Sequence, residues 1–174
     1  MKWYTHAAIG ANAVWLTTLL GVVDERAPLL IGLGALGALL PDIDATQAKI
    51  HFIGGGFLKP LGQLSYHRRF FHSLLMVALL GLVSYLFLEH YFPGVSVCLT
   101  FGYLSHTLID GFNFKGVYYL FPFVKKEYHL LPQWLRTPIG GLADHLLFIA
   151  GIAGITIFLL LYQNYFINFN ALPL

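Results

Sequence analysis

The chain has 174 residues, of which 57% are hydrophobic and only 10% are Asp, Glu, Lys or Arg. Soluble domains carry about 25% charged residues, so this composition argues against a soluble enzyme, a DNA-binding domain or a disordered regulator. The net charge of +2 implies no nucleic-acid partner. The single cysteine excludes an internal disulfide and a cysteine-based zinc finger. The expected class is an all-α integral membrane protein.

Five apolar segments are expected to be helices, at residues 3–23, 28–40, 71–92, 95–109 and 139–162. A membrane-spanning helix needs about 20 residues, so the first, third and fifth segments are long enough and the other two are marginal. The second segment is rich in glycine, which favours close helix packing. Because no repeat or second domain is visible, residues 1–174 are expected to form a single membrane-embedded helical bundle.

The ionisable residues gather on one face of this bundle. If consecutive segments cross in alternating directions, the starts of the first, third and fifth lie on the same face as the ends of the second and fourth. That face carries the candidate metal ligands His6, Asp42, Asp44, His67, His72, His106, Asp110 and Asp144. It also carries nine of the ten lysines and arginines, all except Arg26. The positive-inside rule then predicts a multi-pass protein of the inner membrane, with the ligand-bearing face and the N terminus in the cytoplasm.

His106 and Asp110 form the most specific motif. Residues four apart share one face of a helix, and a histidine and a carboxylate at that spacing suit two ligands of one zinc ion. Both lie at the end of an apolar segment, where ionisable groups are costly and usually functional. The alternative is a structural hydrogen bond between the two side chains.

Three further positions carry candidate acidic ligands. Asp42 and Asp44 follow the second segment and can converge on a metal in a turn, although an aspartate that solvates a helix end is also common. Asp144 opens the fifth segment and is expected to bind or bridge a metal. We assign a catalytic role to Asp44 and Asp144, because a carboxylate left free of the metal can act as general base. His6 is either a ligand or an interfacial histidine.

The run from His67 to Ser73 opens the third segment. A turn at the helix start can bring His67 and His72 inward together, although their spacing does not stack them on a straight helix. Arg68 and Arg69 either anchor to lipid phosphates or bind a substrate phosphate. With Ser73 they form the expected substrate-binding group.

Together these residues resemble a polynuclear metal site. Nitrogen and carboxylate ligands without cysteine suit Zn²⁺ first, with Mn²⁺ or Fe²⁺ as alternatives. Two or three close ions can activate water and neutralise a phosphoryl oxygen. Because the nearest phosphoesters at a headgroup surface are lipids, the expected function is hydrolysis of a phosphoester in a membrane lipid. The alternative is a non-enzymatic membrane protein, either a metal or ion transporter or a lipid-binding scaffold.

Four motifs carry a resemblance to a known family: THAAIGAN from Thr5, LLPDIDA from Leu39, HRRFFHSLL from His67 and SHTLIDGFNFKGVYYLFPF from Ser105. With them the chain resembles, as far as Phe123, the YdjM-like family of LexA-regulated, inner-membrane-associated metal-dependent hydrolases. The resemblance implies metal-dependent hydrolase activity.

A more distant similarity links the chain to bacterial zinc phospholipase C and related single-strand nucleases. It implies a ligand order that falls here on His6, Asp42 or Asp44, His67 or His72, His106 and Asp110. Those enzymes use a processed N-terminal tryptophan as a ligand, whereas Trp3 follows two residues here. Their later histidine–acid pair is missing, so the similarity supports two metals more readily than three.

Overall fold

A computed structural model describes residues 1–21, 27–44 and 69–170, with the side chains of Asp44 and of residues 164–170 outside the description. The described ranges are all-α, and they contain two isolated β-bridges but no strand. The elements are α1 (Trp3–Ala11), α2 (Val14–Leu19), α3 (Ala27–Gly37), the 3₁₀ turn η1 (Leu40–Asp44), α5 (Leu74–Phe87), α6 (Val95–Asp110), the 3₁₀ turn η3 (Gln133–Leu135) and α7 (Leu142–Asn170).

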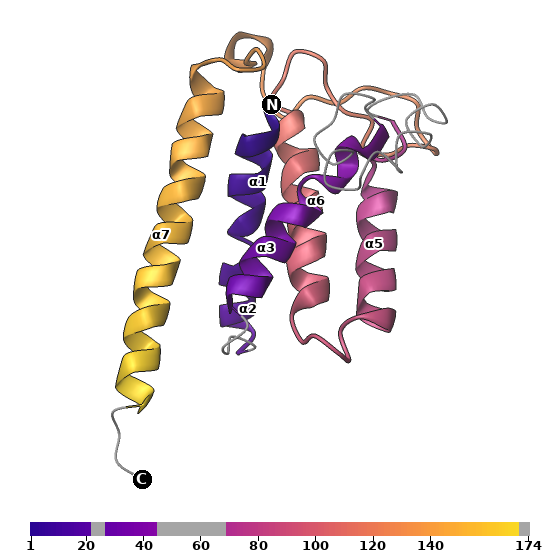
Figure 1. Cartoon of the computed structure of the whole chain (residues 1–174). Coiled ribbons are helices and arrows are strands. Elements are labelled where there is room, and N and C mark those ends of the chain that lie inside the picture. Colours follow the sequence, from indigo (N-terminus) through magenta and orange to yellow (C-terminus); the bar gives the residue numbers. More distant parts are fainter. Residues whose placement is uncertain (22–26, 45–68, 171–174) are drawn as a thin grey trace.

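Three helices form the packed centre of the bundle, because α1, α3 and α6 each contact the other two. In Figure 1, α5 packs on the outer side of α6, and the long α7 packs against α1. Gly34 of α3 lies against the backbones of both other central helices. A Cβ on Gly10 of α1 or Gly102 of α6 would overlap the Gly34 carbonyl oxygen. The expectation that the glycine-rich segment packs closely is confirmed.

The first apolar segment is not one helix. It divides into α1 and α2 at Asn12, whose side-chain amide donates to the Ala8 carbonyl at 2.8 Å and to the Gly151 carbonyl of α7 at 2.9 Å. The third segment is also shorter than expected, because Ser73 caps α5 and the helix ends at Phe87 after 14 residues. Our prediction that both segments form helices of spanning length is therefore wrong.

Among the described residues, α7 alone is long and apolar enough to cross a membrane, over Leu142–Gln163. Only 11% of its most apolar window is buried inside the protein. The outer face of α5 is similarly apolar and open, with Leu82 and Leu86 exposed. Apolar surface of this extent is typical of a site that meets lipid or a partner.

Candidate metal centre

Five of the predicted ligands meet at one end of the bundle. In Figure 1, this is the end where α1 begins, α6 ends and α3 runs into η1. His6 comes from α1, Asp42 from η1, His72 from the segment before α5, and His106 and Asp110 from α6. Residues that are more than 100 positions apart in sequence thus share a single cluster, which we call the His/Asp cluster. The expectation that they lie on one face of the bundle agrees with this arrangement.

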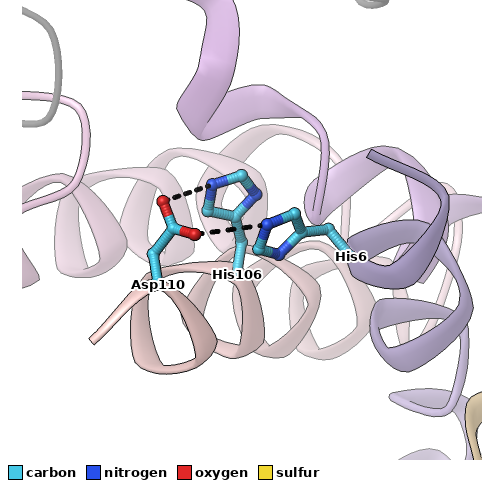
Figure 2. A group of neighbouring side chains, drawn as sticks. All are labelled: His6, His106 and Asp110. Carbon is cyan, nitrogen blue, oxygen red and sulfur yellow. Dashed lines mark ion pairs between the residues drawn. The ribbon is translucent and has the colours of Figure 1, made fainter. Parts of the chain in front are cut away.

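The Asp110 carboxylate points toward two imidazoles, as Figure 2 shows. Its Oδ1 is 3.4 Å from His6 Nε2, and its Oδ2 is 3.8 Å from His106 Nε2. All three side chains are buried, with at most 2% of each exposed. The His6 and His106 rings stack, with centroids 3.7 Å apart. The two oxygens of the carboxylate therefore face different histidines.

Asp42 and His72 complete a second group around His106. The Nε2 atoms of His72 and His106 are 3.2 Å apart. Asp42 Oδ1 lies 3.7 Å from the first and 3.6 Å from the second. His72 Nε2 is also 3.7 Å from Asp110 Oδ2, which connects this group to the first. The two groups are thus continuous, with His106 and Asp110 at their centre.

The orientation of His106 is set by a backbone carbonyl. Its Nδ1 lies 2.6 Å from the Ala38 oxygen, and because a carbonyl only accepts hydrogen bonds, Nδ1 carries the proton and donates it. The lone pair is therefore on Nε2, which faces His72, Asp42 and Asp110. A metal-binding histidine is held in this way when a backbone group fixes its tautomer and ring position.

The spacing of the donor atoms fits a metal ion. Ligands about 2.0–2.1 Å from a tetrahedral zinc lie about 3.3 Å from one another. Five separations among Asp42 Oδ1, His72 Nε2, His106 Nε2 and Asp110 Oδ2 lie between 3.2 and 3.8 Å. Without a cation or a proton between them, a carboxylate and an imidazole lone pair repel each other at these distances. The residues present therefore fit a divalent cation in either of two groups that share His106: Asp42 with His72 and His106, or His6 with His106 and Asp110.

Two contacts to Asp110 were not anticipated from the sequence. The amino group of Met1 donates to Oδ1 at 2.6 Å, and the Asn113 amide donates to the same oxygen at 2.9 Å. Asn113 follows Asp110 by three residues, a spacing that could have identified it as a supporting residue. Nearby, Tyr119 donates to the Thr107 carbonyl. Burial, reinforced by the charge of Asp110, raises the pKa of Tyr119, which keeps the phenol a neutral donor.

Asp144 is held apart from the ligand groups. Its Oδ2 accepts hydrogen bonds from the backbone N–H groups of Lys2 at 3.0 Å and Gly140 at 2.7 Å. These contacts join the start of α1 to the start of α7 and give Asp144 a structural role. Its predicted roles as ligand and as general base stay predictions.

Two residues of the predicted substrate-binding group are described. The Ser73 hydroxyl donates to the Phe70 carbonyl and accepts from the Met76 N–H, so it caps α5. The Arg69 guanidinium lies 5.2 Å from the centroid of the Tyr118 ring. His67, Arg68 and the side chain of Asp44 lie outside the described residues, so their predicted roles are untested.

Comparison with known proteins agrees with the resemblance seen in the motifs. A family model described as YdjM inner membrane protein matches residues 1–170. The chain belongs to this family. The chain is also similar to the uncharacterized protein YvsG of Bacillus subtilis (strain 168), with 32% identity over 131 residues, or 74% of each chain. No solved structure was found to match the chain. This protein therefore belongs to a family described as inner membrane proteins, and it contains a buried His/Asp cluster that could hold a metal ion.

Proposed function

We propose that this YdjM-family protein is a membrane-bound, metal-dependent hydrolase that cleaves a phosphoester of a membrane lipid. The observation that carries the proposal is the convergence of imidazole and carboxylate atoms from four separate segments at 3.2–3.8 Å. Such ionisable groups are costly in an apolar bundle. Their meeting at one point is better explained by a ligand than by the stability of the fold.

Asp42, His72 and His106 would hold one divalent cation, and His6 and Asp110, which group with the same His106, would contribute to a second. Zn²⁺ suits this donor set best, with Mn²⁺ or Fe²⁺ as alternatives. Bound there, such ions supply an acidified water and neutralise charge on a phosphoryl oxygen.

The chain's own residues control access to the cluster. Asp42 has 26% of its side chain exposed, whereas His72, His106 and Asp110 have at most 2% exposed. A substrate would therefore approach over η1, with the buried residues behind it. We assign the binding of a substrate phosphate to Arg69, which begins the described segment that leads to His72.

We further propose that the bundle is embedded with this end in the cytoplasm and with several of its helices within the bilayer. The exposed apolar faces of α5 and α7 support embedding. The excess of lysine and arginine on the side of the cluster supports the orientation. Reporter fusions at the two chain ends would test it, and a cytoplasmic C terminus would contradict it.

The function is tested by metal content and hydrolysis measured on the same preparations. Protein purified from membranes should hold about one or two zinc ions per chain by plasma mass spectrometry. It should also release phosphate or a phosphorylated headgroup from lipid vesicles. The double variant His106→Ala/Asp110→Ala should lose both properties. A matched control, Glu89→Gln/His90→Ala, removes one carboxylate and one imidazole just after the end of α5, at the end of the bundle opposite the cluster, and should keep both.

Two outcomes would contradict the proposal. Equal metal content in both double variants would show that the His/Asp cluster is not the metal site. Metal binding without hydrolysis, together with uptake of Zn²⁺ into proteoliposomes that depends on Asp110, would favour the transporter alternative.

A further inference from the structure

An apolar groove lies beside the His/Asp cluster, between η1, α5 and α6. Its volume is about 270 Å³, and its walls include Ile43, Phe71, Met76, Leu79, Val83 and Tyr103. Ligand pockets usually enclose about 300–1,000 Å³, so this groove suits one part of a ligand. Because its lining is almost wholly apolar, that part must be apolar as well.

The wall formed by α5 is a continuous stripe along one helical face. Met76, Leu79, Leu80 and Val83 follow the spacing i, i+3, i+4 and i+7, and seven residues of helix rise about 10 Å. Leu79 and Val83 remain 46% and 44% exposed. The groove is therefore open along the side of the bundle and not a closed core cavity.

Several residues that line the groove are sequence neighbours of the proposed metal ligands. Ile43 follows Asp42, Phe71 precedes His72, and Tyr103 lies one helical turn before His106 on α6. The Tyr103 hydroxyl donates to the Phe71 carbonyl, which holds the segment before α5 against α6. A molecule with its polar end at the His/Asp cluster would thus have its next atoms beside the apolar walls.

We propose that this groove binds one acyl chain of a lipid phosphate ester whose phosphate lies at the His/Asp cluster. The inference rests on the proposed function, and it adds that the substrate is recognised by its chain as well as by its phosphate. A peptide is a poorer occupant, because its backbone N–H and C=O groups would find no partners in so apolar a groove. An acyl chain has no such groups, and its burial is favourable along its whole length.

The groove is tested first by binding. The probe is a phosphatidic acid carrying a diazirine at the end of one acyl chain, added to the full chain in nanodiscs and activated by light. Labelling should concentrate on residues 71–83 and on Tyr103. Leu79→Trp, which fills the groove, should reduce this labelling about tenfold, the loss expected when roughly two buried methylene groups are displaced. Leu82→Trp is the matched control, because Leu82 is an exposed leucine of the same helix that does not line the groove.

A second measurement uses hydrolysis. The ratio of rates on long-chain and four-carbon-chain phosphatidic acids should fall about tenfold in Leu79→Trp. Val83→Trp, on the same stripe, should do the same, which guards against one variant failing to fold. Leu82→Trp should leave the ratio unchanged.

The outcomes separate this inference from the proposed function. Groove labelling without any hydrolysis would overturn the proposed function and leave the chain site standing. Hydrolysis with no preference for chain length, or labelling spread evenly over the outer faces of α5 and α7, would overturn the chain site alone.

Discussion

Two buried aspartates at the same end of the bundle differ in what surrounds them. Asp110, on α6, faces the imidazoles of His6, His72 and His106. Asp144, on α7, accepts hydrogen bonds from the backbone N–H groups of Lys2 and Gly140. Both are essentially unexposed, so burial does not distinguish them. The type of partner does, because imidazoles can share a cation with a carboxylate, whereas backbone N–H groups have no lone pair to offer a metal.

The largest expected difference between the two aspartates is in metal affinity. If the proposed metal site is correct, Asp110→Asn, which removes a carboxylate from the centre of the His/Asp cluster, should weaken zinc binding by at least about 100-fold, as measured by competition with a chromophoric chelator. Asp144→Asn should leave the affinity within about twofold, because its contacts are to backbone groups. An equal loss in both variants would contradict the contrast and restore Asp144 as a ligand.

The next effect is on stability and concerns Asp144. Asp144→Ala leaves the N–H groups of Lys2 and Gly140 without their acceptor, which should reduce the free energy of unfolding by about 1–3 kcal/mol. Denaturant unfolding in detergent measures this change, with metal content followed in parallel. An unchanged midpoint of the unfolding transition would show that the hydrogen bonds from Lys2 and Gly140 to Asp144 do not stabilise the fold.

Ser73 gives a smaller effect of the same kind. Ser73→Ala removes the cap of α5 and should cost about 1 kcal/mol of stability, whereas Ser73→Asp should retain the cap. If capping is the whole role of Ser73, the KM for a lipid phosphate should not move in either variant. A raised KM at unchanged stability would instead support the predicted role in substrate binding.

The smallest effect is expected at the opposite end of the bundle, where Glu89 accepts hydrogen bonds from the Gly94 and Ser96 N–H groups and the Ser96 hydroxyl. Burial raises the pKa of Glu89, but the hydrogen bonds from Ser96 and Gly94 outweigh it, so the pKa lies below its ordinary value of 4.5. The stabilisation is therefore present above about pH 4.5 and is lost as pH falls through the lower, folded value.

Glu89→Gln tests that pH dependence. The variant should be less stable than the parent protein at pH 7 by at most about 1 kcal/mol. The difference should shrink toward zero as the pH is lowered below 4, when the parent carboxylate becomes protonated. Thermal unfolding at several pH values measures it, and a difference that grows on acidification would have the wrong sign.

Much of the fold could be predicted from hydropathy alone. All five apolar segments contain helices, and the glycine-rich second segment packs closely against α1 and α6. Helix lengths could not be predicted, because they depend on contacts made across the bundle. The division at Asn12 is held by the Gly151 carbonyl of α7, 139 residues away.

For the candidate site, too, part could be predicted from the sequence and part could not. Residue type, spacing and the alternation of apolar segments were enough to place His6, Asp42, His72, His106 and Asp110 at one end of the bundle. They could not separate Asp110 from Asp144, because both are aspartates beside a histidine-bearing helix end. Only the tertiary structure decides which carboxylate meets imidazole and which meets backbone, since each partner comes from a distant segment. The sequence by itself predicted that most of the few ionisable groups of an apolar chain lie at one end of the bundle, because each is costly within an apolar segment.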